Sequence, residues 1–253
     1  MSSFSVLSLP QEQLENLEAL GYQSMTPVQM AALPPGLAGR DLVVQAQTGS
    51  GKTVAFGLPV LADINPRDFG TQALILCPTR ELAAQVATEI RRLARALPNL
   101  KVVVLCGGQP IGPQIGSLEH GAHIVVGTPG RVKDHLRKQT LTLPRLKTLV
   151  LDEADRMLDM GFSDDMTDII SETPSSRQTL LFSATFPDDI ASISAQYQRT
   201  PERITVSTQV ADGQIAQIFV RTQRSDKTRA LINLIQGYQP SAAVIFCQTK
   251  AAV

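Results

Sequence analysis

Residues 42–53 read LVVQAQTGSGKT, a short apolar run followed by a glycine-rich turn that ends in lysine and threonine. The turn matches the phosphate-binding P-loop pattern except that Ala46 stands in place of the first glycine. Gly49 and Gly51 allow successive backbone N–H groups to point inward at a phosphate. Lys52 can pair with the β and γ oxygens, and the Thr53 hydroxyl can hold Mg²⁺. The stretch therefore predicts a nucleoside triphosphate site between a strand and a helix, whose positive end would face the phosphates.

Further short apolar runs follow along the first 206 residues, separated by segments with helical spacing. The runs are rich in Val, Ile and Leu without polar alternation, as expected of parallel strands buried on both faces. One intervening segment, Glu81–Leu97, has apolar residues that recur at helical spacing. This alternation predicts a doubly wound α/β domain, a mostly parallel sheet flanked by helices. The predicted strands are Leu42–Gln45, Ala73–Cys77, Val102–Leu105, Ile124–Val126, Thr148–Leu151 and Thr179–Phe182.

The residues that follow these strands are small, polar or glycine-rich. In chain order they read AQTGSGKT, PTRE, GG, TPGR, DEAD and SAT. Turns favour Gly, Pro, Ser and Thr in any protein, so one such segment alone carries little weight. Ligands of open parallel sheets bind beyond the carboxyl ends of the strands, however, and all six segments would meet there. We therefore expect them to form one functional site at that edge.

Three carboxylates end the apolar run in the sequence LVLDEADRML. Asp152, Glu153 and Asp155 would repel one another at a strand end and resist the loss of water. A Mg²⁺–triphosphate would offset this repulsion, with Asp152 placed like the aspartate that holds Mg²⁺ in other P-loop proteins. Glu153 is then placed to orient and deprotonate the attacking water. Asp155 needs hydroxyl or cationic partners, for which Ser183 and Thr185 are candidates.

Composition restricts the class of protein but not its partners. Of the 253 residues, 43% are hydrophobic, and 23 basic side chains balance 23 acidic ones, as in ordinary globular proteins. A protein-wide basic surface for nucleic acid is therefore excluded, and any polyanion must be bound by local groups. Neither a signal peptide nor an apolar run near the ~18 residues that span a bilayer is visible, so we expect a cytoplasmic protein with no membrane partner.

The cysteines and histidines form no metal-binding pattern. The cysteines are far apart and odd in number, which argues against a disulfide framework or a zinc site and predicts reduced thiols at strand ends. They are Cys77, Cys106 and Cys247. The histidines have no repeating ligand spacing and are expected to be surface imidazoles. They are His120, His123 and His135.

Seven segments in order, GYQSMTPVQ, AQTGSGKT, PTRELA, GG, TPGR, DEAD and SAT, resemble the first RecA-like domain of a DEAD-box RNA helicase. The resemblance covers essentially all of residues 1–206, and Ala46 agrees with it, because that family commonly has alanine there. It implies an ATP-dependent enzyme that unwinds or remodels RNA duplexes locally, a monomer with ATP and Mg²⁺ as cofactors and RNA as partner. More loosely, Gly107–Pro110 (GGQP) resembles a bacterial subgroup with a C-terminal module for ribosomal RNA, which implies a role in assembly of the large ribosomal subunit.

The resemblance also implies roles for individual residues. Gln29 would read the adenine edge with its amide, and the upstream aromatic Phe4 would stack on the base. Lys52 and Glu153 would act in catalysis, and Thr53 and Asp152 would hold Mg²⁺. The ATP-binding set is Phe4, Tyr22, Gln29, Ala46, Gln47, Thr48, Gly49, Ser50, Gly51, Lys52 and Thr53. The set that links nucleotide state to RNA binding is Asp155, Ser183 and Thr185. The set that contacts the RNA sugar–phosphate backbone without reading sequence is Pro78, Thr79, Arg80, Gly107, Gly108, Thr128, Pro129, Gly130 and Arg131.

After the first domain we expect a linker at 207–214 and the truncated start of a second RecA-like domain at 215–253. Its predicted elements are a strand at Ile215–Thr222, a helix at Asp226–Gln236 and a strand at Ala242–Cys247. The sequence IFCQTK that ends this part resembles the opening motif of the family's second domain. That domain supplies arginines to the γ-phosphate and half of the RNA surface, so we expect residues 1–253 alone to be inactive or very weakly active.

Two alternatives stay open beside an RNA-unwinding enzyme. One is a non-catalytic module that clamps nucleotide or RNA together with a partner. The other is a different P-loop class, such as a transporter ATPase or a small-molecule kinase. The second is disfavoured because the chain lacks an LSGGQ-type signature and because PTRELA, TPGR and SAT would go unexplained. Stimulation of ATP turnover by RNA would separate the enzyme from the clamp.

Overall fold

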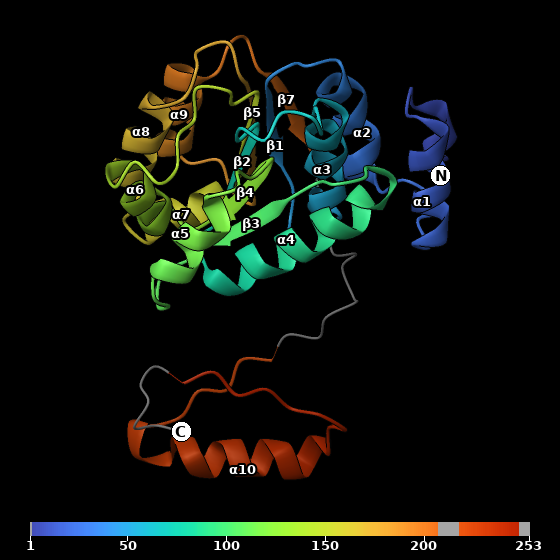
Figure 1. Ribbon diagram of the computed structural model, residues 1–253. Coiled ribbons are helices and arrows are strands. Elements are labelled where there is room, and N and C mark those ends of the chain that lie inside the picture. Colours follow the sequence, from blue (N-terminus) through green and yellow to red (C-terminus); the bar gives the residue numbers. More distant parts are fainter. Residues whose placement is uncertain (1, 207–217, 248–253) are drawn as a thin grey trace. The chain divides into compact units, whose positions relative to one another are not determined.

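Seven parallel strands form one sheet in the order β3-β4-β2-β5-β6-β1-β7 (Figure 1). The computed structural model describes residues 2–206 and 218–247. Its contacts divide the chain into two units, Met1–Thr208 and Gln209–Val253, and the sheet belongs to the first. The strands are β1 (Leu42–Gln45), β2 (Ala73–Leu76), β3 (Val102–Leu105), β4 (Ile124–Gly127), β5 (Thr148–Asp152), β6 (Gln178–Ser183) and β7 (Glu202–Thr205).

Helices connect the strands and cover both faces of the sheet (Figure 1). The helices of the first unit are η1 (Phe4–Val6), α1 (Gln11–Ala19), α2 (Pro27–Leu37), α3 (Lys52–Ala62), α4 (Arg80–Leu93), η2 (Ala94–Ala96), α5 (Gly112–Leu118), α6 (Pro129–Arg137), α7 (Ala154–Asp159), α8 (Ser163–Ser171) and α9 (Asp188–Tyr197). Among the described residues, no helix combines the length and the apolar character needed to cross a membrane.

Two hydrophobic cores lie on opposite faces of the sheet, and strands β1 to β6 contribute to both by alternation. In β2, Ala73 and Ile75 pack against helices α1 to α4, whereas Leu74 and Leu76 pack against helices α5 to α9. Successive side chains of a strand point to opposite faces, so a strand covered on both sides must be apolar throughout. The continuous Val, Ile and Leu runs of the sequence follow from this two-sided burial.

Local capping fixes where the helices at the carboxyl edge begin. The Thr79 hydroxyl accepts a hydrogen bond from Leu82 N at 3.2 Å and starts α4. Thr26 and Gln29 form a capping box at the start of α2, with Pro27 in the first turn. Helix α3 follows directly on Gly51, whose φ of 93° lies in the left-handed region that favours glycine. The turns of the predicted site therefore lead straight into helix N-termini.

The predicted α/β class and all six predicted strands are confirmed, with ends that differ by at most one residue. The predicted helix 81–97 corresponds to α4 and η2. Strand β7 was not predicted, because its sequence ERIT carries no apolar run. It lies at the sheet edge, paired only with β1 among the described strands. Most of its residues are at least partly exposed, and exposed edge-strand residues are often polar.

The described part of the second unit contains η3 (Arg224–Asp226) and α10 (Lys227–Tyr238), which confirms the predicted helix within two residues at either end. The strand predictions are wrong for residues 218–222 and 242–247, which form no strand. A strand requires a ladder partner, and neither segment has one among the described residues, so Phe219 and Phe246 remain 92% and 95% exposed. The predicted linker 207–214 and residues 215–217 lie outside the described residues.

The prediction of surface imidazoles holds for His120 but is wrong for His123 and His135, which are fully buried. Buried imidazoles require hydrogen-bond partners. His123 Nδ1 accepts from Lys101 N at 3.0 Å, and its Nε2 lies 3.1 Å from the carbonyl oxygen of Pro66. Strand-end thiols are confirmed at two positions, because Cys77 follows β2 and Cys106 follows β3, both free and buried.

Candidate functional site

The strand order sorts the predicted site residues into two neighbouring groups along the carboxyl edge. The segments predicted to contact RNA follow β3, β4 and β2, which are adjacent in the sheet. The nucleotide, metal and coupling segments follow β5, β6 and β1, which are the next three strands. Since all these strands are parallel, their carboxyl ends share one edge. The fold thus places the two predicted binding surfaces side by side.

The P-loop turn is held open by glycine geometry and by the Gln29 amide. Gly49 and Gly51 have φ values of 83° and 93°, and a Cβ added to Gly51 would lie 2.5 Å from Gln29 Nε2. Gln29 Nε2 donates to the Gly51 carbonyl at 3.2 Å, and its Oε1 accepts from Thr26 N at 2.9 Å. The amide keeps one N–H and one lone-pair direction for another partner. Gln29 therefore joins the start of α2 to the phosphate-binding turn.

The rest of the turn is tied to the neighbouring strand end. Ala46 is buried and its N–H donates to the Ser183 carbonyl at 2.9 Å, which joins the strand ends of β1 and β6. The Ser50 hydroxyl donates to the Gln47 carbonyl at 2.7 Å. Gln47, Thr48 and Gly49 are exposed at the tip of the turn. An exposed glycine-rich tip of this kind can turn backbone N–H groups toward an anion.

Lys52 and Asp152 are buried, and each has a charged atom without a hydrogen-bond partner among the described residues. Lys52 is 6% exposed and Asp152 is 3% exposed, and neither Lys52 Nζ nor Asp152 Oδ1 has a hydrogen-bond partner among the described residues. Burial raises the pKa of Asp152 to about 6, with Lys52 opposing the shift and Glu153 adding to it. Buried charged groups are normally satisfied, so these two atoms fit a ligand with anionic oxygens and a cation. A Mg²⁺-bound triphosphate has that chemistry.

Glu153 is buried beside this pair in a conformation unusual for a non-glycine residue. Its φ of 53° and ψ of 51° are left-handed, and such strained positions cluster at functional sites. Oε1 accepts from the Thr48 hydroxyl at 3.0 Å, and Oε2 pairs with Arg156 Nη1 at 2.9 Å. The carboxylate is therefore held from both sides and keeps further lone-pair directions for a water molecule.

Asp155 is bonded to one of its two predicted partners. Both the N–H and the hydroxyl of Thr185 donate to Asp155 Oδ2, at 2.8 and 2.9 Å. The Ser183 hydroxyl is buried without a full hydrogen-bond partner among the described residues, yet it lies near enough to help lower the pKa of Asp155. Burial alone would raise that pKa, but the hydrogen bonds from Thr185, Arg156 N and Ser183 together outweigh it. The coupling segments after β5 and β6 thus meet.

The predicted RNA surface is only partly exposed. Arg80 and Gly108 are exposed and adjacent, because a Cβ on Gly108 would collide with the Arg80 guanidinium. Arg131 has a side chain only 11% exposed, and its Nη2 donates to the Gln109 carbonyl at 2.9 Å. The other predicted residues line the same turns. Thr79, Gly107 and Gly130 are half-buried, and Pro78, Thr128 and Pro129 are buried.

Phe4 and Tyr22 pack against each other, with ring centroids 6.2 Å apart. Phe4 is 4% exposed, so its ring face is not available to a base in this conformation, and its stacking role stays a prediction. The Tyr22 hydroxyl donates to Glu89 Oε1, and burial together with this contact raises the pKa of Tyr22 to about 12. The two aromatics therefore anchor the N-terminal segment to the domain.

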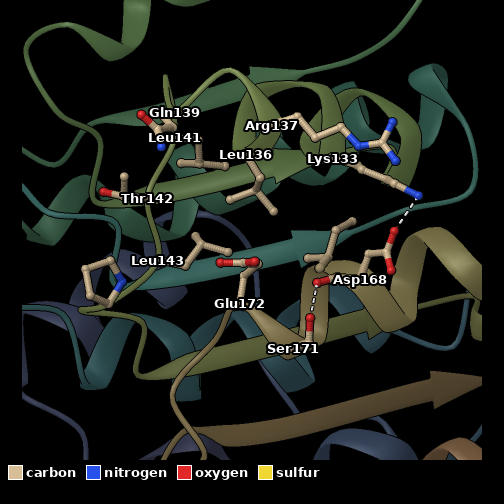
Figure 2. A pocket seen from close by; sticks show the side chains of 12 residues that line it. Lys133, Leu136, Arg137, Gln139, Leu141, Thr142, Leu143, Asp168, Ser171 and Glu172 are labelled. Carbon is tan, nitrogen blue, oxygen red and sulfur yellow. Dashed lines mark hydrogen bonds and ion pairs between the residues drawn. The ribbon is translucent and has the colours of Figure 1, made fainter.

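A pocket of about 820 Å³ lies away from this chemistry, between α6, α8 and the connection at 139–144 (Figure 2). Lys133 on its wall pairs with Asp165 at 2.8 Å and with Asp168 at 2.5 Å. The lining includes the last turn of α6, whereas the first turn of that helix holds the TPGR segment. The lining carries two basic and two acidic side chains, so the pocket has no net charge that would favour an anion.

Sequence reasoning missed four residues that organise the site. Arg156 gave a usable signal, since it stands three residues after Glu153 on a helix, where side chains meet. Gln109, Gln114 and His135 gave none, because their contacts join segments that are distant in sequence. They hold the turn after β3 against α6.

The fold and this site define the class of protein. A parallel sheet with a P-loop after β1 and an acidic pair after β5 is a RecA-like P-loop nucleoside triphosphatase domain. The family model described as DEAD/DEAH box helicase matches residues 26–193, and the chain belongs to that family.

Named relatives agree with this family. The chain is 58% identical over 251 residues to the ATP-dependent RNA helicase DbpA of Escherichia coli, covering 99% of this chain and 55% of the relative. It is 43% identical to the ATP-dependent RNA helicase CshA of Listeria monocytogenes, covering all of this chain and 49% of the relative. A solved DEAD box protein from Methanococcus jannaschii superposes with a TM-score of 0.78 and 39% identity, over 92% of this chain and 63% of that one. The chain thus spans about half the length of the curated relatives.

Proposed function

We propose that this chain is the ATP-binding half of an ATP-dependent RNA helicase, which remodels RNA duplexes locally by coupling ATP hydrolysis to RNA binding. One observation carries the proposal: beside Glu153, Lys52 Nζ and Asp152 Oδ1 are buried without a hydrogen-bond partner in the described part of the chain. This arrangement suits a triphosphate, a divalent cation and an attacking water. The names of the relatives, all ATP-dependent RNA helicases, support the same activity.

The residues of the site have separate tasks in this function. The backbone amides at Gly49–Thr53 and the Lys52 ammonium bind the phosphates, and Gln29 recognises adenine. Thr53 and Asp152 hold Mg²⁺, which supplies positive charge against the phosphate oxygens when it is bound. Glu153 orients the attacking water and accepts its proton. Thr48 and Arg156 fix the carboxylate that does so.

RNA is bound on the neighbouring part of the edge, through its sugar–phosphate backbone. Arg80, Arg131 and the amides around Gly107 and Gly108 suit phosphates and 2′-hydroxyl groups rather than base edges. Asp155 and Thr185 link this surface to the nucleotide. We further propose ribosomal RNA as the partner and large-subunit assembly as the process, supported by the 58% identity to DbpA.

The domain division belongs to the same proposal: residues 1–206 form the first RecA-like domain and 215–253 begin the second. The protein would act as a cytoplasmic monomer. Because arginines from a second domain stabilise the γ-phosphoryl transition state, an effect worth ~10³–10⁵-fold in related enzymes, we expect hydrolysis by residues 1–253 alone to be near background.

Phosphate release by the purified chain tests this function. It is measured with and without RNA, and then with the part of Escherichia coli DbpA that the chain does not cover added in trans. We expect background rates until the added part and RNA are both present. Strong RNA-stimulated turnover by the chain alone would contradict the division of labour. Binding of ATP and RNA with no turnover in any mixture would instead favour a non-catalytic clamp.

A further inference from the structure

A chain of buried and half-buried polar side chains joins the turn after β3 to helix α6. Gln114 on α5 is 8% exposed and His135 on α6 is fully buried. Gln114 Nε2 donates to the Cys106 carbonyl at 3.0 Å, and its Oε1 lies 3.3 Å from His135 Nε2. The other ring nitrogen, Nδ1, lies 2.8 Å from the Thr140 hydroxyl, which in turn donates to the His135 carbonyl at 3.2 Å. We call Gln114, His135 and Thr140 the polar relay.

A second hydrogen bond, from nearer the start of α6, holds the same turn. Arg131 Nη2 donates to the Gln109 carbonyl at 2.9 Å, one helical turn before His135. The carbonyls at Cys106 and Gln109 are thus both held from outside the turn, and they bracket Gly107 and Gly108. The relay therefore fixes the segment after β3 relative to the segment after β4.

The position of this turn determines what the exposed edge presents. Gly108 has a φ of 74°, and the Arg80 guanidinium occupies the space where a Cβ of that residue would lie. A shift of the turn would move its backbone N–H groups and displace Arg80 with them. These are the exposed groups of the surface that we propose for RNA, so the geometry of that surface depends on the buried ties.

Polar side chains at these buried positions are not needed to fill the core. Burial of an amide or an imidazole is unfavourable unless it is hydrogen-bonded, and an apolar side chain of similar volume would pack without that penalty. The relay residues lie beside apolar neighbours such as Leu118 and Val132. The relay provides a directional hydrogen bond to the Cys106 carbonyl, which an apolar side chain would not.

We propose that Gln114 and His135 are positioning residues for RNA binding, which hold the Gly107–Gly108 turn in register with helix α6. They touch no RNA themselves and act through the turn, Arg80 and Arg131. This inference rests on the proposed function, because it assumes that the edge after β3, β4 and β2 binds RNA.

The test compares RNA and nucleotide affinity in variants of the 253-residue chain. A labelled single-stranded oligouridylate at low salt reports RNA binding by fluorescence anisotropy, and Mg²⁺–ADP is titrated by calorimetry. We expect Gln114→Leu to weaken RNA binding about tenfold, equivalent to one directed hydrogen bond, and to leave ADP affinity unchanged. His135→Phe should act in the same direction. Hydrogen exchange of the amides at Gly107 and Gly108 should become faster in both.

Two control variants on α5 separate positioning from lost stability. Leu118→Ala removes core packing on the same helix but leaves the relay intact, so it should lower the melting temperature without weakening RNA binding. Ser117→Ala removes an exposed hydroxyl whose bond lies within the helix and should change neither property. Equal loss of RNA affinity in Leu118→Ala and Gln114→Leu would overturn the inference by showing a merely structural role.

Arg80→Ala distinguishes failure of the inference from failure of the proposed function. If Arg80→Ala weakens RNA binding but Gln114→Leu does not, the edge binds RNA without help from the relay, and the inference is wrong. If Arg80→Ala has no effect or the chain does not bind the oligouridylate, the proposed RNA surface is itself wrong, and the inference is overturned with it.

Discussion

Thr185 donates both its backbone N–H and its hydroxyl to a single oxygen of Asp155, at 2.8 and 2.9 Å. Asp155 lies in the first turn of α7, the helix after β5, and Thr185 follows the neighbouring strand β6. These two hydrogen bonds join the acidic segment to the SAT segment across adjacent strand ends. These bonds lower the pKa of Asp155, although burial alone would raise it.

Thr185→Val should lower the free energy of unfolding by about 1 kcal/mol at pH 7, since it removes the hydroxyl bond and keeps the backbone N–H. The pKa of Asp155 is lowered from 3.8, so its stabilisation is present above that value and is lost as the pH falls through the lower folded value. The deficit of the variant should therefore shrink below pH 4. Urea unfolding at a series of pH values measures this deficit, and Ser192→Ala, which removes an exposed hydroxyl elsewhere, is the control. A deficit that is constant down to pH 2 would contradict it.

Asp152→Asn should stabilise the nucleotide-free chain while it weakens Mg²⁺-dependent nucleotide binding. Burial raises the folded pKa of Asp152 from 3.8 to about 6. The ionised carboxylate therefore reduces stability above pH 6 by about 2–3 kcal/mol and has no such effect below pH 4. The gain in the variant should be largest at pH 8 and vanish near pH 4.

Thermal unfolding at a series of pH values measures that gain, and Asp159→Asn is the control because this acid lies exposed at the end of α7, the helix that follows β5. No change in stability is expected from the control at any pH. If Asp152→Asn destabilised the free chain at pH 8, the attraction between Asp152 and Lys52 would outweigh the burial of charge, against our expectation.

His123→Ala should lower the free energy of unfolding by about 2–4 kcal/mol. It deprives the Lys101 N–H and the Pro66 carbonyl of buried partners and leaves a cavity beneath Phe69, whose ring lies 5.0 Å from the imidazole. His120→Ala, three residues earlier and exposed, should change stability by less than about 0.5 kcal/mol. Chemical denaturation of both variants gives the comparison, and similar values for the two would show that His123 is not a structural link.

The fold was predictable because its signal is local. Buried parallel strands are apolar on both faces, so runs such as Ala73–Leu76 stand out without knowledge of their partners. Strand β7 and the buried histidines were missed for the opposite reason. An edge strand such as Glu202–Thr205 needs no apolar run, and nothing near His123 in the sequence shows that Lys101 and Pro66 will meet it.

Those site residues were predictable whose type and local motif alone indicate their chemical role. Lys52, Asp152 and Glu153 could be placed at one edge from strand ends alone. The partial burial of Arg131 could not be recognised, because its partner is a carbonyl 22 residues earlier in the chain. Predictions of the strands at 218–222 and 242–247 failed since apolar residues form strands only where a neighbouring strand accepts their hydrogen bonds.

Gln29→Ala should weaken ATP binding more than GTP binding, by roughly 1–3 kcal/mol, because the buried amide is the group that can pair with the adenine edge. The variant also loses the bonds to Thr26 N and the Gly51 carbonyl, so both nucleotides should bind somewhat less tightly. Calorimetric titration of ATP and GTP on wild type and variant separates the two effects. Gln23→Ala, an exposed amide nearby, serves as the control. Equal affinity of the wild type for both nucleotides would refute adenine selectivity.

Glu153→Gln should preserve folding, nucleotide binding and RNA binding but reduce hydrolysis by ~10²–10⁴-fold, the usual contribution of a general base. The hydrogen bonds of Glu153 explain why the substitution should leave folding and binding intact. The amide oxygen of glutamine can still accept from Arg156, and its NH₂ group can donate to the Thr48 hydroxyl, which reverses its own role from donor to acceptor. What the amide cannot do is take a proton from water. Phosphate release is measured with RNA and the remaining part of DbpA present, and Glu119→Gln, an exposed acid, is the control. Near-normal RNA-stimulated turnover by Glu153→Gln would remove Glu153 from the role of base.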